Sequence, residues 1–168
     1  MYYHIYKSEI GKIYLVSKGH ALCGCYLESQ KNFPKEILNY QKDDSLKIFI
    51  EATNWLERYF KGENVENNEI SLEVNGTDFR KNVWNIIKGI PYANTVTYKQ
   101  IADTIIKNNK LKSMSYQAVG SAVGYNPLLI FIPCHRVIRS DGDIKGYSAG
   151  NEIKKFLLNL ECDNKILL

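Results

Sequence analysis

The amino-acid sequence predicts an α+β protein in which a sheet precedes a set of helices. Residues 1–28 are rich in Tyr, Ile, Val and Leu and are interrupted by Gly11 and Gly19, which is typical of short strands joined by turns. From Asp44 onward, apolar residues recur at helical spacing. Between residues 97 and 125, two short helical patterns are joined by a polar connection, which is the outline of a helix-turn-helix.

Three strands are expected at the start of the chain, over residues 2–6, 12–17 and 21–27. The polar stretch 29–43, which contains Pro34, predicts a loop or a short helix. We therefore expect a small sheet to form before the first long helix.

The first long helix is expected over residues 44–60, where Asp43-Asp44-Ser45 supplies capping side chains and Gly62 supplies a stop. Residues 63–69 are acidic and rich in Asn, which indicates a linker. The alternating residues 70–74 predict one further strand.

The second half of the sequence predicts three short helices, each preceded by a capping residue. They are expected over residues 78–88 after Thr77 or Asp78, 98–107 after Thr97, and 116–125 after Ser115.

The remaining residues predict two strands around a Cys-His pair and one last helix. Residues 128–132 form an apolar run that predicts a buried strand, and residues 137–139 predict another. Residues 146–150 form a loop of small residues suited to wrapping a flat ligand, although it is equally suited to a plain connection. In the last helix, 151–161, we expect Lys154 and Lys155 to face outward.

Length and composition set the broad class of protein. A chain of 168 residues suits one domain or two small ones. No run of 18 apolar residues exists, and the first residues lack the layout of a signal peptide, so we expect an intracellular, cytoplasmic protein without a membrane partner. The four cysteines are few and unevenly spaced, which argues against a disulfide framework and leaves Cys134 as a free thiol.

The net charge of +4 is unevenly distributed along the chain. Residues 1–75 contain 9 Lys and Arg against 11 Asp and Glu, whereas residues 76–168 contain 13 against 7. A basic half is a modest indication of nucleic-acid binding, and the alternative interpretation is a solvated lysine surface.

Residues 132–137, Ile-Pro-Cys-His-Arg-Val, are the strongest candidate for chemistry. A cysteine reacts as its thiolate, and a neighbouring base or cation favours that form. Here Cys134 is followed by His135 and Arg136, and Pro133 stiffens the approach to it. Buried free cysteines are usually inert, so the pair alone does not establish a nucleophile.

The helix expected after Ser115 has an unusual run of small residues, among them Gly120 and Gly124. A glycine within a helix costs about 1 kcal/mol relative to alanine, so another requirement must favour it. The two interpretations are close packing against another helix and close approach to a ligand such as the floor of a DNA groove.

Together these residues resemble the O6-alkylguanine-DNA alkyltransferases, also called methylated-DNA–protein-cysteine methyltransferases. The similarity follows the order and spacing of the second half, and the first half is similar only in size and in its sheet-then-helix pattern. The matching positions are Gly76 to Phe79, Val83-Trp84, Ile90-Pro91, Tyr98, Ile101-Ala102, Ala118 to Gly120, Asn126-Pro127, Ile132 to Val137, Gly146-Tyr147, Leu157-Leu158 and Glu161.

The resemblance implies an N-terminal ribonuclease H-like sheet domain, residues 1–75, and a C-terminal helical, winged-helix-like DNA-binding domain, residues 76–168. It implies DNA repair by direct reversal without a cofactor. A monomer binds double-stranded DNA that contains O6-alkylguanine, with O4-alkylthymine as a further possible substrate. The damaged base is flipped out through the minor groove, and its alkyl group is transferred irreversibly to Cys134 in a single turnover.

The resemblance also implies roles for individual residues. Cys134 is the nucleophile, His135 reaches it through a water, and Glu161 orients His135. Tyr98 donates toward the departing guanine, and Asn126 braces the turn that carries the site. The pocket is shaped by Tyr147, Ser148, Val137 and Ala149, and Ala149 narrows it where a glycine is common.

For DNA, the helix after Ser115 is expected in the minor groove. Gln117 occupies the position from which many relatives insert an arginine into the gap left by the flipped base. Further DNA contacts are implied for Thr97, Tyr116, Ala118, Gly120, Ser121, Arg136 and Ser140.

Some relatives hold zinc in the first domain, so His4, His20, Cys23 and Cys25 deserve comparison with known zinc patterns. Their spacing is not a recognised zinc pattern, and Cys23 and Cys25 would share one face of a strand, where burial explains them equally well. We therefore predict no metal site.

Three other functions compete with this interpretation. A lesion sensor of the alkyltransferase-like type lacks the cysteine that is present here as Cys134. A helix-turn-helix regulator would leave Cys134, His135 and Glu161 unexplained. A cysteine hydrolase would need turnover and an oxyanion hole, for which the sequence has no clear signature.

Overall fold

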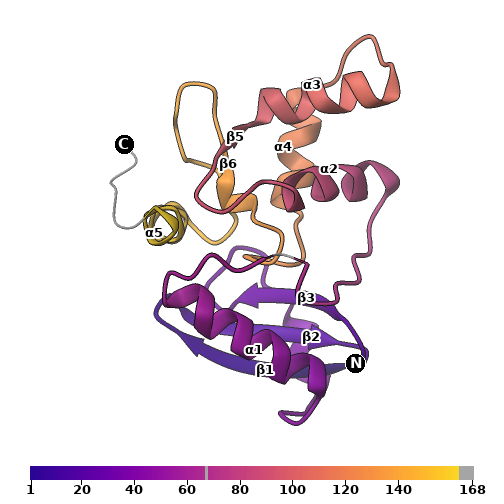
Figure 1. Ribbon diagram of the computed structural model, residues 1–168. Helices are drawn as coiled ribbons and strands as arrows, with labels where there is room; N and C mark the ends of the chain where they lie inside the picture. The colour runs from indigo at the N-terminus through magenta and orange to yellow at the C-terminus, as the bar shows by residue number, and fades with distance from the viewer. Residues whose placement is uncertain (67, 163–168) are drawn as a thin grey trace.

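A computed structural model describes residues 1–66 and 68–162 and shows an α+β arrangement, with a sheet and one helix on one side and a group of helices on the other (Figure 1). The sheet has the strand order β3-β2-β1-β4. Its strands are β1 (Tyr2–Ser8), β2 (Gly11–Ser17), β3 (Leu22–Leu27) and β4 (Gln41–Lys42). The first three strands are antiparallel and agree with the prediction, whereas the parallel strand β4 was not predicted.

Helix α1 (Lys47–Phe60) lies across one face of this sheet, as Figure 1 shows. Its buried side chains join those of β2 and β3 in the main hydrophobic core. The opposite face is covered by the short 3-10 helix η1 (Lys35–Asn39), whose Ile37 packs on Tyr14 and Val16. The prediction of a loop or short helix over residues 29–43 is thereby confirmed.

A β-bulge at Cys23 separates the two cysteines of β3. Gly24 pairs with Val16 and Leu22 with Ser17, so Cys23 has no pairing partner across the strand. As a result Cys25 is part of the main core, whereas Cys23 packs with the cluster on the other face. The expectation that the two share one face was wrong, because a bulge shifts the period of two that the prediction assumed.

Two boundaries in the first half differ from the prediction. Helix α1 begins after Leu46 without a side-chain cap, because Asp43 accepts hydrogen bonds from the amide and hydroxyl of Ser45 instead. Residues 70–74 form no full strand among the described residues. They make a single bridge between Leu72 and Leu22.

The second half contains three packed helices, α2 (Asp78–Lys88), α3 (Tyr98–Asn109) and α4 (Tyr116–Gly124). The predicted caps Thr77, Thr97 and Ser115 each accept a hydrogen bond from a backbone amide in the first turn. The helices enclose an apolar centre, and the indole of Trp84 donates to the carbonyl of Ala122 at 2.8 Å.

The parallel pair β5 (Val96–Thr97) and β6 (Val137–Ile138) joins the start of α3 to the chain that follows Cys134. The last helix, α5 (Asn151–Glu161), lies beside them in Figure 1. Among the described residues, no helix is both long and apolar enough to cross a bilayer.

Residues 128–132 are buried as predicted, but they form a turn rather than a strand. The amide of Phe131 donates to the carbonyl of Leu129 at 2.9 Å across Ile130, whose φ is 72°. This γ-turn is rare for a β-branched residue, and apolar packing on all sides holds it. An apolar run cannot distinguish a buried strand from a buried turn.

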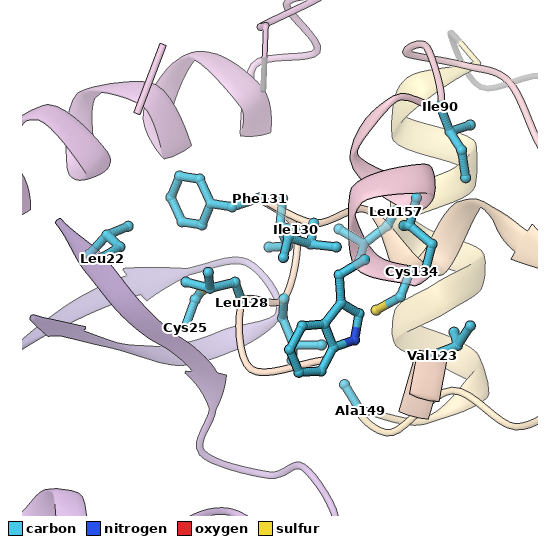
Figure 2. Packing of buried hydrophobic residues seen from close by; sticks show 14 of the residues in the cluster. Leu22, Cys25, Ile90, Val123, Leu128, Ile130, Phe131, Cys134, Ala149 and Leu157 are labelled. Carbon is cyan, nitrogen blue, oxygen red and sulfur yellow. The ribbon is translucent and has the colours of Figure 1, made fainter. Parts of the chain in front are cut away.

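The two parts of the molecule meet at this turn. The amide of Cys25 in β3 donates to the carbonyl of Pro127 at 2.8 Å, and the carbonyl of Cys25 accepts from the amide of Leu129 at 3.1 Å. Figure 2 shows Leu128 and Ile130 between Cys25 of the sheet and Cys134 of the helical part. The sheet domain therefore buttresses the segment that carries the Cys-His pair.

Candidate active site

Cys134 begins the one-turn 3-10 helix η2 (Cys134–Arg136) and is only 2% exposed. Pro133 forms the centre of an inverse γ-turn, with φ −77° and ψ 64°, in which the amide of Cys134 donates to the carbonyl of Ile132 at 2.7 Å. Pro133 thus turns the chain directly before the thiol.

Asn126 fixes the thiol from the preceding turn. Its side-chain amide donates to Cys134 Sγ at 3.0 Å and to the carbonyl of Ile132 at 2.7 Å, while its oxygen accepts from the amide of Leu128 at 3.0 Å. One buried side chain thus holds both the turn and the sulfur, at the place where the sequence predicted a brace.

His135 and Glu161 form a buried pair. His135 Nε2 lies 2.6 Å from Glu161 Oε1, and both side chains are fully buried. A neutral imidazole that donates from Nε2 keeps Nδ1 as its acceptor, and Nδ1 makes no hydrogen bond to any described residue. This arrangement matches the predicted pairing of His135 with Glu161.

The carboxylate of Glu161 accepts from five donors. Oε1 accepts from the Tyr59 hydroxyl at 2.7 Å, from His135, and from Arg136 Nη2 at 3.0 Å. Oε2 accepts from Arg136 Nε at 2.8 Å and from the amide of Ala93 at 3.1 Å. Such saturation favours a charged group that orients its partners and does not itself take a proton.

Arg136 does not reach the surface. It is 2% exposed, and besides Glu161 it donates to the carbonyl of Ile90 at 2.6 Å. The prediction that Arg136 contacts DNA was therefore wrong. A guanidinium is drawn inward here because a buried carboxylate offers it a two-pronged ion pair.

Burial and charge set the protonation states of these groups. Burial raises the pKa of the Cys134 thiol, and the hydrogen bond from Asn126 and the charge of Lys154 only partly oppose it. Burial also lowers the pKa of His135, against the pull of Glu161. Burial alone would raise the pKa of Glu161, but His135 and Arg136 outweigh it and lower that pKa to about 2. The resting site is a protonated thiol beside a neutral histidine, so the expected stabilisation of the thiolate by His135 does not prevail before substrate arrives.

Lys154 is 1% exposed and donates to the carbonyl of Val137 at 2.6 Å, so the expectation that it faces solvent was wrong. It lies one helical turn before the buried Leu157 and Leu158 and two turns before Glu161, on the inner face of α5. Helical spacing could have revealed this position, but lysine is so seldom buried that the prediction placed it outside.

Tyr98 is the first residue of α3 and is half-buried. The pairing of β5 with β6 brings it to the Cys134 side of the helical part, and burial followed by the charge of Cys134 raises its pKa. Thr97 directly before it caps α3 through its hydroxyl, in a capping box with Gln100.

The predicted pocket residues lie in β6 and in the loop that follows it. Val137 is buried in β6, and Tyr147 and Ala149 are buried in the loop that follows. The Tyr147 hydroxyl makes no hydrogen bond to any described residue. Burial, followed by the charge of Cys134, raises the pKa of Tyr147 well above its usual range. Ser148 is half-buried, and its carbonyl accepts from the amide of Lys31 in the sheet domain at 3.1 Å.

A cleft of about 620 Å³ opens beside this loop. Its walls come from residues 26–36 of the sheet domain, from the end of α4, from residues 125–127 and from Ser148, and Asn126 is among the lining residues. A neighbouring hollow is lined by Tyr147, Ser148 and Ala149. The cleft thus leads from the surface to Asn126, whose side chain holds the Cys134 thiol.

Helix α4 presents a polar and small surface outward. Tyr116, Gln117, Ser121 and Gly124 are exposed, and Ala118 and Gly120 are half-buried. A Cβ added at Gly124 would meet no atom within 4 Å, and one at Gly120 would only touch the Tyr98 ring at 4.0 Å. Close packing against another helix therefore explains neither glycine. Ser140 is exposed in the turn after β6.

The four candidate zinc ligands lie apart in the sheet domain. His4 pairs with Asp44, and His20 is exposed near Glu73. Cys23 and Cys25 occupy opposite faces, as described above. Within residues 1–66 and 68–162, no three His, Cys, Asp or Glu side chains are grouped to hold a metal ion.

The main residue that sequence reasoning missed is Tyr59. It belongs to α1, 102 positions before the carboxylate that it contacts. On an amphipathic helix rich in aromatic residues, a tyrosine is normally interpreted as part of the hydrophobic core, so no local signal marks Tyr59 as a site residue.

Comparisons with known proteins cover both halves of the chain. Residues 78–162 match the family described as 6-O-methylguanine DNA methyltransferase, DNA binding domain, and residues 1–74 match its ribonuclease-like domain. A methylated-DNA–protein-cysteine methyltransferase of Methanosarcina barkeri is 43% identical over 98% of this chain and 99% of that protein. One of Haemophilus influenzae is 35% identical over 96% and 86%, respectively. The crystal structure of Mycobacterium tuberculosis OGT in complex with DNA superposes with a TM-score of 0.86 at 33% identity, covering 99% of this chain and 96% of that chain.

Proposed function

The chain belongs to the 6-O-methylguanine DNA methyltransferase family, and we propose that it repairs DNA by accepting the alkyl group of O6-alkylguanine on the sulfur of Cys134. As a member it is a methylated-DNA–protein-cysteine methyltransferase that acts on DNA. The observation that carries the assignment to Cys134 is its thiol, fixed by Asn126 at 3.0 Å in the turn that also contains the His135–Glu161 pair.

In the proposed reaction, His135 takes the proton of the thiol at Nδ1 through a water, and Glu161 steadies the imidazolium that forms. The thiolate attacks the alkyl carbon in line with O6. The sulfur–carbon bond forms while the carbon–oxygen bond breaks, and the electron pair of that bond remains on the base. The base takes up one proton to become guanine, which balances the proton lost by the thiol. The thioether is stable, so each molecule acts once.

The leaving base is stabilised by donors placed around it. We assign this role to the phenol of Tyr98, which burial keeps protonated. The backbone at Cys134 and Val137 reads the guanine edge, Tyr147 and Ser148 shape the pocket with Ser148 near O6, and Ala149 narrows it. The hollow lined by Tyr147, Ser148 and Ala149 supports this assignment.

A buried thiol cannot reach a base within a duplex, so the damaged nucleotide must be flipped out of the stack. We propose that α4 enters the minor groove with its exposed, small-residue face. Gln117 then fills the gap and hydrogen-bonds the unpaired cytosine. Tyr116, Ala118, Gly120 and Ser121 contact the groove, with Thr97 and Ser140 at its edges. The open space around Gly124 supports a close approach of DNA.

The proposal includes the organisation of the chain. Residues 1–75 form the sheet domain and residues 76–168 the DNA-binding domain, whose last residues lie outside the described part. We propose that the protein acts as a monomer in the cytoplasm on double-stranded DNA, with O4-alkylthymine as a candidate second substrate.

Transfer of a labelled alkyl group tests the function. Wild-type protein is incubated with duplex DNA that carries a labelled methyl on O6 of one guanine, and label on protein is counted after denaturation. We expect one label per molecule, located on the peptide that contains Cys134. Cys134→Ala should accept none.

Cys23→Ala is the matched control, because it removes a half-buried cysteine far from the site and should retain full transfer. Methyl release in excess of protein would show catalytic turnover and contradict the mechanism. Label that persists on Cys134→Ala would contradict the assignment of the nucleophile.

A further inference from the structure

Tyr59 brings the sheet domain into contact with the reactive cluster of the helical domain. Its hydroxyl lies 2.7 Å from Glu161 Oε1 and 3.3 Å from His135 Nε2. The residue is fully buried near the end of α1. No other side chain of residues 1–66 makes a hydrogen bond to Glu161 or His135.

We propose that Tyr59 is a positioning residue for the alkyl transfer, whose hydroxyl holds the carboxylate of Glu161 in the orientation from which it aligns His135. The inference rests on the proposed function of the Cys134 site. It gives the sheet domain a part in the chemistry beyond mechanical support.

The packing around Tyr59 requires its aromatic ring but not its hydroxyl. The ring stacks on Trp55 at 5.5 Å and meets Phe60 edge-on, so a phenylalanine would fill the same space. A buried hydroxyl without a partner costs free energy, and within the described part of the chain this hydroxyl bonds only to Glu161 and His135. The polar atom is therefore matched to the reactive pair and not to the core.

Removing this donor changes the charge that His135 faces. Oε1 shares its negative charge among Tyr59, His135 and Arg136, so the loss of one donor strengthens its attraction for the proton on His135. The other charged or titratable groups that act on the pair are Lys154, on the same helix as Glu161, and Tyr147, on a facing segment. The Cys134 thiol adjoins His135 in the chain. None of these is altered by a change at position 59.

The test is the pH dependence of the transfer rate in Tyr59→Phe. A His135 that holds its proton more tightly stops acting as a base at a higher pH. The acid limb of the pH–rate profile should move to higher pH. If it moves by one pH unit, the rate on that limb should be about tenfold lower than in the wild type. At higher pH the two rates should converge. Tyr14→Phe is the matched control, because Tyr14 is also buried and donates to a carboxylate, Glu28, but lies outside the site.

Fluorotyrosine introduced at position 59 keeps the shape and is a stronger donor, so it should move the acid limb to lower pH, opposite to Tyr59→Phe. This second variant keeps the test sharp if Tyr59→Phe folds poorly. Equal slowing at every pH, shifts in the same direction, or a matching shift in Tyr14→Phe would each overturn the role of Tyr59. A wild-type protein that transfers no label would instead overturn the proposed function itself.

Discussion

Lys154 is a buried cation whose removal should make the cysteine harder to ionise. Its charge is among the influences that lower the pKa of the Cys134 thiol against burial. Burial lowers the pKa of Lys154 itself to about 8, so it is charged at neutral pH and neutral well above that value. Lys154→Met should therefore raise the thiol pKa and slow transfer near pH 7 by on the order of tenfold for each unit.

The measurement is the single-turnover rate between pH 6 and 9.5. The difference in rate between wild type and Lys154→Met should narrow above pH 8, where Lys154 of the wild type loses its charge. Lys155→Met, at the exposed neighbouring position, should follow wild type throughout. A gap of constant size across this range would mean that Lys154 acts through packing alone.

Ala149 should set the size limit for the transferred group. It is 8% exposed and lines the hollow beside Tyr147. Ala149→Gly removes a methyl group from this wall, so benzyl transfer should accelerate several-fold while methyl transfer changes little, in line with the ~1–3 kcal/mol that one methylene is worth in a pocket. The comparison uses duplexes carrying one O6-methylguanine or one O6-benzylguanine. Equal effects on both substrates would count against a steric role.

For individual residues, the sequence predicted chemical roles better than it predicted burial. Resemblance placed Glu161 with His135, and the two side chains meet at 2.6 Å. It also placed Arg136 on DNA and Lys154 in solvent, although both are buried. The rule that charged side chains stay outside fails where a cluster of opposite charges compensates burial, and that compensation depends on residues distant in the sequence.

The small-residue face of α4 should trade stability for access to DNA. Gly124 has helical geometry and free space where a Cβ would lie, so Gly124→Ala should raise the free energy of unfolding by about 0.5–1 kcal/mol. The same methyl group would meet the floor of the groove and weaken DNA binding. Urea unfolding and binding to an alkylated duplex measure the two effects.

Asn54→Ala is the control for helix propensity, since Asn54 is exposed on α1 of the sheet domain. It should gain stability without losing affinity for DNA. If Gly124→Ala binds DNA as tightly as wild type, α4 does not lie against the groove as proposed.

Gln117 should weaken the electrostatic part of DNA binding relative to an arginine at this position. The side chain is exposed in the first turn of α4. Gln117→Arg should bind more tightly at low salt and steepen the dependence of log affinity on log salt concentration by up to about one unit. Titration of a fluorescent duplex at several salt concentrations provides the measurement. An unchanged affinity and slope would contradict the prediction.

Elements with local signals were predictable, and those fixed by tertiary contacts were not. The caps at Thr77, Thr97 and Ser115 were confirmed because each acts on its own first turn. The turn at Ile130 was mistaken for a strand, since its positive φ is maintained by surrounding apolar groups and not by any turn residue.

The stability of the whole molecule should depend on Glu161 at acid pH. Its pKa is lowered from 4.5 to about 2, so the charged carboxylate contributes stability that is present above pH 4.5 and is lost as the pH falls toward 2. This lowering of the pKa corresponds to about 3 kcal/mol of folding stability. Glu161→Gln should be less stable than wild type at pH 7 but lose less further stability below pH 4.5.

Urea unfolding of both proteins between pH 5 and pH 3 checks this expectation. Glu152→Gln removes an exposed carboxylate from the same helix and should retain the acid sensitivity of wild type. Parallel curves for wild type and Glu161→Gln would show that other groups govern acid unfolding.

The hydrophobic pattern of the sequence predicted the general architecture. It did not predict the interface between the sheet part and the helical part. A sheet followed by helices was evident from the two hydrophobic periods. The contacts of Tyr59 with Glu161 and of Cys25 with Leu129 link residues about 100 positions apart, and no local pattern encodes them. Such contacts decide how the two parts meet.

The near-complete burial of Cys134 has a consequence for the lifetime of the unused protein. Under the proposed single-turnover reaction, a molecule is lost for repair whenever its sulfur reacts with a stray electrophile or oxidant. At 2% exposure, and with the thiol held protonated, the sulfur is shielded from reagents dissolved in the cell. If the damaged nucleotide is flipped out as proposed, its alkyl group reaches the sulfur directly, so the same packing that slows accidental modification reserves each molecule for damage carried on DNA.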